Sequence, residues 1–87
     1  MSGTGFIVTW DVNSSDAGQC ARLRRLIYGY ALRRGDRPYR YPGFVDRPGV
    51  RYLGQSVLFV PPRLVGTLRE ALHFLQVEYT AVPAALW

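Results

Sequence analysis

Arginine and tyrosine recur through one region of this sequence, and both side chains can contact nucleic acid. Residues 22 to 51 contain nine arginines against Asp36 and Asp46, a net charge of +7, whereas the rest of the chain has a net charge of −2. A guanidinium pairs with phosphates through a planar fork, and a tyrosine ring offers a flat surface on which a base can stack. The pattern predicts binding of RNA or DNA through Arg22, Arg25, Arg33, Arg34, Arg37, Tyr39, Arg40 and Tyr41.

Two simpler explanations of this pattern stay open. All eleven basic residues are arginine, which codon usage in a GC-rich genome would also produce. The arginines could instead form a solvated face while the tyrosine rings cover the core. Tyr30 fits this second explanation because it continues the apolar stripe of the preceding helix, whereas Tyr39 and Tyr41 belong to no helical pattern.

Asp11 is the acidic residue at the end of the first expected strand, and Ser14, Ser15 and Asp16 follow it closely. Mg²⁺ prefers oxygen ligands and is often held by one or two carboxylates plus the phosphates of a substrate. Asp11 is therefore the candidate metal ligand, with a second copy of the chain completing the site, and it would be the catalytic residue if the chain cleaves phosphodiesters. Alternatively, Asp11 accepts hydrogen bonds from the backbone of the following turn. We interpret Asp16 as a helix cap rather than a ligand.

The remaining reactive side chains argue against several classes of enzyme. Cys20 falls on an apolar helix stripe and His73 on an outer helix face, so neither fits a Ser-His-Asp or Cys-His site. A single cysteine gives no internal disulfide and no zinc site, which favours a reducing compartment. No glycine-rich phosphate loop follows a strand, which argues against ATP or dinucleotide chemistry. Residues 1–5 lack the layout of a signal peptide. No apolar run approaches the ~18 residues of a membrane span, so we expect a cytoplasmic protein.

Hydrophobic periodicity predicts the first half of the fold. Residues 5–12 read as a strand covered mainly on one side. A helix capped by Asp16, with Gln19 in capping-box position, continues past Ala31 and directs Arg22, Arg25 and Arg33 to water. From residue 35 to residue 50 the period breaks into an exposed excursion rich in Arg, Tyr and Pro. Its near-repeats DRPYRY and DRPGVRY suggest either the two arms of a hairpin or a mobile loop.

The second half completes the predicted fold. Residues 50–60 are β-rich, with a kink or bulge at Gly54 and enough length in this region for two strands. Pro62 opens a second helix, and residues 77–82 alternate as a last strand closed by Pro83. The prediction is one α+β domain over residues 1–87, a ferredoxin-like βαββαβ fold with two helices on one face of an antiparallel sheet.

Several of these features resemble the small CRISPR-associated adaptation subunit known as the Cas two family, and its VapD-like relatives. The first strand ends in Trp10-Asp11-Val12, an arginine-rich helix follows, and Gln55-Ser56-Val57-Leu58-Phe59 is similar to the family's Gln-x-Ser-Val-Phe strand. The similarity covers most of the chain apart from residues 35 to 50. It implies a ferredoxin-like homodimer whose basic face binds nucleic acid and whose Asp11 binds a divalent metal for endonuclease activity. It also implies a place in a larger protein complex, in which many members are architectural and do not need to cleave.

Two functions of different class therefore remain. The first is a nucleic-acid-binding homodimer, with Mg²⁺-dependent cleavage as an added activity. The second is a non-enzymatic interaction module whose excursion docks a protein through Tyr, Pro and Phe44. A homodimer is expected because an 87-residue chain has a small core and residues 77–87 carry more apolar surface than one small sheet needs.

Overall fold

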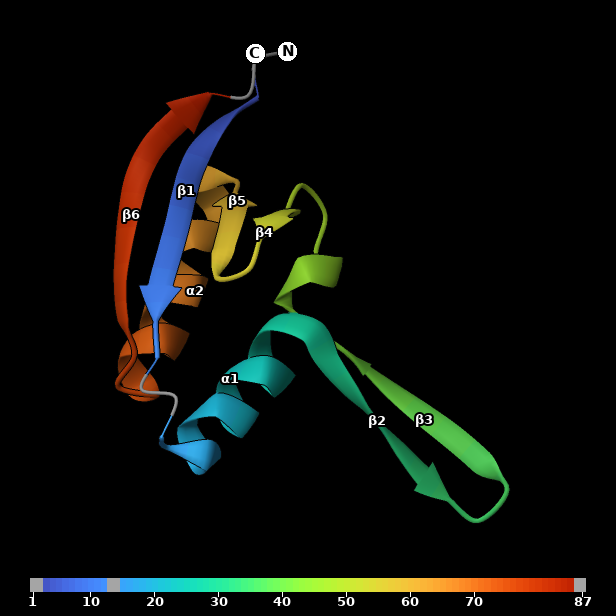
Figure 1. Cartoon of the computed structure of the whole chain (residues 1–87). Coiled ribbons are helices and arrows are strands. Elements are labelled where there is room, and N and C mark those ends of the chain that lie inside the picture. The colour runs from blue at the N-terminus through green and yellow to red at the C-terminus, as the bar shows by residue number, and fades with distance from the viewer. Residues whose placement is uncertain (1–2, 13–14, 86–87) are drawn as a thin grey trace.

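The computed structural model describes residues 3–12 and 15–85. In chain order, these residues form β1 (Thr4–Asp11), α1 (Ala17–Tyr28), β2 (Gly29–Arg34), β3 (Arg37–Pro42), the 3-10 helix η1 (Phe44–Asp46), β4 (Arg51–Gly54), β5 (Val57–Val60), α2 (Pro62–Phe74) and β6 (Glu78–Ala85). Figure 1 shows that β2 and β3 project from the rest of the molecule. We call residues 29–42 the arm and the other described residues the body.

The body is built on a four-stranded antiparallel sheet in the order β4-β5-β1-β6, whereas β2 and β3 form a separate two-stranded sheet. The element order is therefore βαββββαβ, and the prediction of a βαββαβ ferredoxin-like fold is wrong. The error lies after the first helix, where residues expected to continue that helix and to form an irregular excursion instead pair with each other.

Both helices pack on one face of the sheet around a single core. Strand alternation directs Val8 and Trp10 of β1 and Leu58 of β5 to this face. The helices contribute the buried side chains Leu23, Ile27, Leu68 and Leu72. Complete burial of such a side chain stabilises the fold by about 1.5–3 kcal/mol. The body thus has a continuous apolar interior that fixes both helices relative to the sheet.

Helix α1 begins as predicted and ends earlier than predicted. The backbone N–H of Gln19 donates to Asp16 Oδ1 at 2.9 Å, which confirms Asp16 as the helix cap. The Gln19 side chain does not close a capping box, because its amide donates to the carbonyl oxygens of Leu75 and Gln76 near the end of α2. The helix stops at Tyr28, since Gly29 has φ +79° and ψ −173°, a conformation reserved for glycine. The expected extension past Ala31, with Arg33 on its outer face, is wrong.

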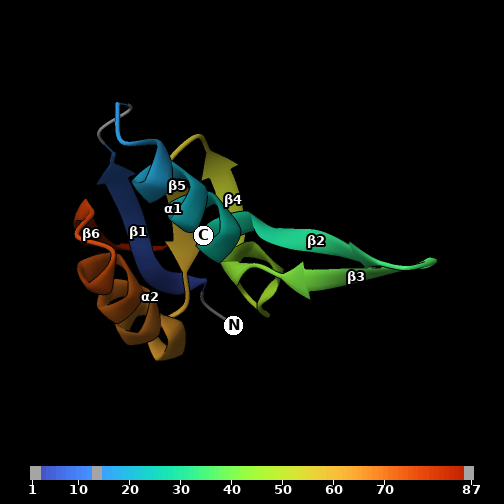
Figure 2. The same cartoon turned by 90° about the horizontal axis from the view of Figure 1, so that it is seen from below.

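The arm is a regular hairpin with a tight turn. Its strands pair from Gly29 opposite Pro42 to Arg34 opposite Arg37. The two turn residues are Gly35 and Asp36, and Gly35 has φ +60°, the sign that a type II′ hairpin turn needs at its first position. Figures 1 and 2 both show the arm extending away from the body. Of the two alternatives for the excursion, the hairpin is correct, but its strands are β2 and β3 rather than the two near-repeats.

The root of the arm is held by close backbone approach and by one acidic side chain. A β-carbon added to Gly29 would lie 2.7 Å from the backbone nitrogen of Gly43. The two glycines therefore allow the two backbone segments at the root of the arm to approach each other closely. Asp46 Oδ2 accepts from the Gly43 backbone N–H at 2.9 Å and from Arg40 Nη2 at 3.0 Å. Phe44 is only 3% exposed and belongs to the core. Its assignment to an exposed docking loop is therefore wrong.

The second half of the body follows its predicted local signals. The register between β4 and β5 shifts between Tyr52 and Gly54, which confirms the predicted irregularity at Gly54. Helix α2 begins at Pro62, also as predicted. Neither described helix is both long enough and apolar enough to cross a membrane.

Strand β6 continues through Pro83 instead of stopping there. Trp10 donates its backbone N–H to Ser56, so alternate residues of β1, among them Phe6, direct their hydrogen bonds toward β5. Pro83 lies opposite Phe6, and its nitrogen therefore points away from β1 to the outer edge of the sheet. A proline is compatible with an edge strand in this orientation because no ladder hydrogen bond is lost.

Candidate nucleic-acid interface

The two faces of the arm carry different side chains. Register and alternation place six residues on one face, in the cross-strand pairs Tyr30–Tyr41, Leu32–Tyr39 and Arg34–Arg37. We call these six residues the ring face. The opposite face carries Ala31, Arg33, Pro38 and Arg40. The arm therefore separates its tyrosines from half of its arginines.

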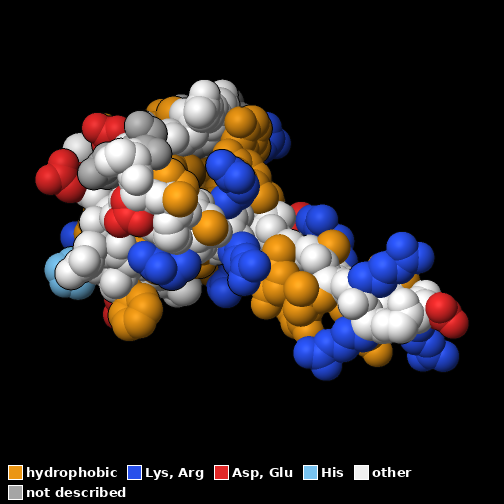
Figure 3. All heavy atoms as spheres, turned by 60° about the horizontal axis from the view of Figure 1, so that its bottom comes forward, with side chains coloured by type: hydrophobic (Ala, Val, Ile, Leu, Met, Phe, Trp, Pro, Cys, Tyr) orange, Lys and Arg blue, Asp and Glu red, His pale blue; other side chains and the backbone are white. Residues whose placement is uncertain are grey.

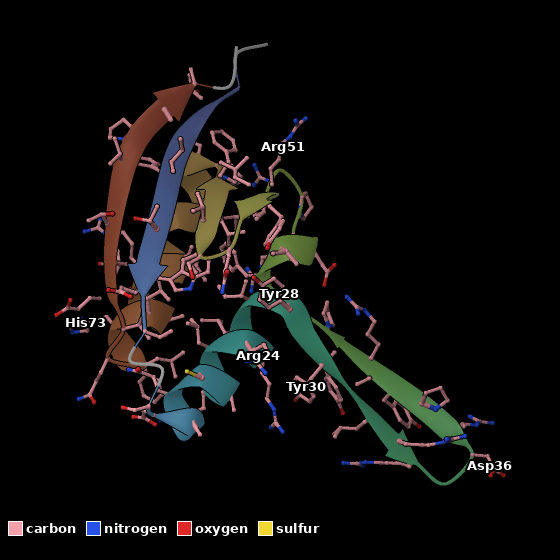
Figure 4. The ribbon with its side chains drawn as sticks, viewed as in Figure 1. Arg24, Tyr28, Tyr30, Asp36, Arg51 and His73 are labelled. Carbon is pink, nitrogen blue, oxygen red and sulfur yellow. The ribbon has the colours of Figure 1, made fainter. Side chains whose placement is uncertain are left out.

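None of the three tyrosines of the ring face is buried, and two of them stack on each other. Tyr30 and Tyr41 stack with ring centroids 4.7 Å apart and planes 16° from parallel. Tyr39 lies farther toward the tip and is 48% exposed. No residue of the arm is buried, so the ring face is open to solvent along its length. Figure 4 shows Tyr30 close to the root of the arm and Asp36 at its tip.

The ring face continues into a groove between the two helices. This helix groove has a volume of about 410 Å³ and is lined by Arg22, Arg25, Leu26, Tyr30, Ala71, Phe74 and Leu75. The guanidinium carbon of Arg25 lies 5.1 Å from the centre of the Tyr30 ring, a cation–π contact that joins α1 to the arm. Figure 3 shows hydrophobic side chains gathered on the arm with arginine side chains beside them and at the tip. The molecule thus presents a continuous surface of rings bordered by cations.

Six of the eight predicted binding residues belong to this surface, namely Arg22, Arg25, Arg34, Arg37, Tyr39 and Tyr41. The other two lie on the opposite face of the arm. Arg33 is exposed there, and Arg40 forms the exposed ion pair with Asp46. Arg40 therefore has a structural partner at the root of the arm.

The sequence missed Tyr30 and Phe74 as members of this surface. The apolar periodicity places Tyr30 in the core, but Tyr30 lies in β2 and stacks on Tyr41. The signal that could have found it is the glycine before it, which ends helices when its φ is positive. Phe74 is 85% exposed, and its position outside the apolar stripe of the second helix was the available signal.

A second pair of tyrosines joins the end of α1 to the sheet. The rings of Tyr28 and Tyr52 meet edge to face, with centroids 5.9 Å apart. Desolvation raises the pKa of Tyr28, and the hydrogen bond to Tyr52 raises it further. Figure 4 places Tyr28 where α1 passes into the arm. The neutral phenol of Tyr28 thus links the end of α1 to β4.

Asp11 lies on a different part of the molecule, at the exposed end of β1. Its direct cross-strand partner is Glu78, the first residue of β6. Side chains of such partners have their β-carbons about 4.5–5.5 Å apart. Residues 13 and 14 of the following turn lie outside the described residues. The expected proximity of Ser14 to Asp11 therefore stays a prediction. The sequence missed Glu78 because its proximity to Asp11 depends on the pairing of the first and last strands.

The Asp11–Glu78 pair partly fits a magnesium site. Two carboxylates on one face of the sheet match the oxygen ligands that Mg²⁺ takes when a substrate phosphate and water complete its shell. Within residues 3–12 and 15–85, no group of three or more His, Cys, Asp or Glu side chains is placed to hold a metal. The pair could therefore bind the ion only together with other oxygen ligands.

Comparison with known proteins gives no relative on which to base an assignment. No family model, no curated protein and no solved structure matches this chain.

Proposed function

We propose that this protein binds nucleic acid through the ring face of the arm and the arginines that border it. The observation that carries the proposal is the continuity of this surface, from Arg22 and Arg25 beside the helix groove to Arg34 and Arg37 at the tip. Stacked and exposed tyrosines lie between these two cationic ends. Such a surface can neutralise phosphates at both ends while its rings contact bases.

The arm's architecture supports a binding role. A two-stranded hairpin is marginally stable in water by itself, and β2 and β3 pair only with each other. A partner that covers the ring face would therefore stabilise the arm as well as be bound by it. Arginine at four positions would contribute a slope of about −3 to the dependence of log affinity on log salt.

We extend the proposal to a cytoplasmic homodimer of the kind that the Cas two resemblance implies, working within a larger complex. The helix-free face of the sheet supports it, since Ile7 and Val82 lie opposite each other there and Val82 is exposed. Residues 86 and 87 of the apolar tail lie outside the described residues. Light scattering at micromolar concentration should give the mass of two chains, and a monomer mass would contradict the dimer.

A second candidate activity, Mg²⁺-dependent endonuclease cleavage of RNA or DNA, rests on the Asp11–Glu78 pair. Directly opposed carboxylates repel each other, and a bound cation would remove that repulsion. Asp11 and Glu78 would hold the ion, which would supply charge stabilisation to a phosphodiester. Asp11→Asn should abolish Mg²⁺-dependent cleavage and leave dimerisation and nucleic-acid binding intact. If the wild type binds but does not cleave with Mg²⁺ or Mn²⁺, the protein is a binding or architectural subunit.

Two double variants with the same change in charge test the binding proposal. Arg34→Ala/Arg37→Ala removes arginines of the ring face, and Arg33→Ala/Arg40→Ala removes arginines of the opposite face. The first variant should weaken binding to every sequence alike and reduce the salt slope by roughly 1.5, whereas the second should change both much less. Fluorescence anisotropy titrations at several salt concentrations measure both quantities.

The outcomes separate nucleic acid from a protein partner. Equal losses in the two double variants would show that the faces of the arm do not differ in binding. Absence of binding to RNA and DNA at low salt would contradict the proposal and favour the protein-docking module. Leu32 on the ring face is compatible with such a module, whose affinity should depend less on salt.

A further inference from the structure

We propose that the helix groove between α1 and α2 is a binding site for an unpaired base, so that the natural ligand is single-stranded nucleic acid. This inference rests on the proposed function and names its substrate class. Of the residues that line the groove, only Arg22 and Arg25 belong to the predicted binding region, and the groove adds Phe74, Leu26, Ala71 and Leu75 to the surface.

Phe74 is the observation that starts the argument. Its side chain is 85% exposed at the last position of α2, whereas Leu68 and Leu72 of the same helix are fully buried. The body therefore does not use this ring for packing. A phenyl ring that borders an open groove is a surface on which a base can stack, and such stacking does not depend on the identity of the base.

The rest of the groove is complementary to a nucleotide, because it combines an apolar lining with positive charge. Leu26, Ala71 and Leu75 supply an apolar lining, and Arg22 and Arg25 supply two cations. None of the described residues that line the groove is acidic. A base could occupy the apolar part while its phosphates contact the guanidinium groups, and the contact with Tyr30 positions Arg25 beside the groove.

The aromatic character of the surface favours a single strand over a duplex. In a duplex the faces of the bases are stacked on one another, so side chains reach only base edges and phosphates. Base edges are read mainly by Arg, Lys, Asn and Gln side chains, yet between Arg25 and the arginines of the tip the surface presents Tyr30, Leu32, Tyr39 and Tyr41. Single strands expose base faces, and proteins bind them with rings of this kind along a cationic path.

The experiment compares Phe74→Ala with His73→Ala. His73 is the exposed neighbour of Phe74 on α2 and does not line the helix groove. Each variant is titrated with a labelled single-stranded oligonucleotide of about 12 nucleotides and with the matching duplex, as RNA and as DNA. Phe74→Ala should weaken single-strand binding at least about fivefold. It should leave duplex binding and the melting temperature unchanged, and His73→Ala should behave as the wild type.

Each outcome decides a different point. If Phe74→Ala binds single strands as tightly as the wild type, or if the wild type prefers the duplex, the inference is overturned while the proposed function stands. If the wild type binds no nucleic acid at low salt, the proposed function fails and the inference fails with it. If Phe74→Ala lowers the mass measured by light scattering without weakening single-strand binding, the groove is an interface between copies and the inference is overturned.

Discussion

The body and the arm of this molecule are stabilised by different kinds of contact. The body buries side chains from both helices and from the sheet in one core, and several of them are fully inaccessible. The arm buries none, and its contacts are cross-strand pairs such as the stacked rings of Tyr30 and Tyr41. Most of the folding free energy therefore comes from the body, and the side chains of the arm stay available to contact a partner.

This difference has a consequence for dynamics. Local opening costs little where few apolar contacts are buried and backbone hydrogen bonds face solvent, and it costs up to the full free energy of unfolding in a core. The arm should open and close without unfolding the body, and its fixed point is the root at Gly29, Gly43 and Asp46. Substitutions at matched positions in the two parts can test this separation.

The largest expected effect comes from removing a core side chain. Leu72 has no exposed surface, so Leu72→Ala should lower the free energy of unfolding by about 2–5 kcal/mol. The same truncation on the arm, Leu32→Ala, should cost less than about 1 kcal/mol, because Leu32 is 38% exposed. Urea denaturation followed by circular dichroism measures both. Similar losses at the two positions would show that the arm is part of the cooperative core.

The next largest effect should come from the root of the arm. Gly29→Ala places a side chain in a backbone conformation reserved for glycine, and its β-carbon would clash with the backbone of residues 41–43. The substitution should therefore lower the free energy of unfolding by at least about 1–3 kcal/mol. Gly35→Ala at the tip also requires positive φ but has nothing within 4 Å, so it should weaken the pairing of the arm by about 1–2 kcal/mol and leave the melting of the body nearly unchanged. Thermal melts of the two variants rank them. A milder loss for Gly29→Ala would show that the root is not rigid.

The smallest effect concerns pH. Because desolvation and the Tyr52 hydrogen bond raise the pKa of Tyr28, the neutral phenol contributes stability that is fully present below the unfolded pKa of about 10. That contribution is lost as the pH rises through the higher folded pKa. Tyr28→Phe should therefore flatten the decline of melting temperature above about pH 10. A decline as steep as in the wild type would show that Tyr28 is not a source of it.

Local chemistry predicted the body better than the arm. The Asp16 cap, the Pro62 helix start and the irregularity at Gly54 each depend on one residue and its neighbours, and all three were predicted correctly. The end of the first helix and the strands of the hairpin were predicted wrongly. Helical periodicity does not report the positive φ of Gly29, the residue at which α1 ends and β2 begins.

The candidate site shows the same division. Residue type alone identified the arginines and tyrosines of the region, and six of the eight share one surface. Which face of the arm each residue occupies depends on the register of β2 and β3, so the separation of Arg33 and Arg40 could not be predicted. Glu78 beside Asp11 likewise follows from pairing between the first and last strands.

The orientation of Pro83 also limits how copies of this protein can meet. A strand from another molecule that aligned along the outer edge of β6 would find no N–H at this position, and one of its carbonyl groups would lose a donor. Sheets of two copies are therefore discouraged from merging into one continuous sheet through β6. The same missing donor disfavours extension of the sheet at this edge, which exposed edge strands otherwise promote at high concentration.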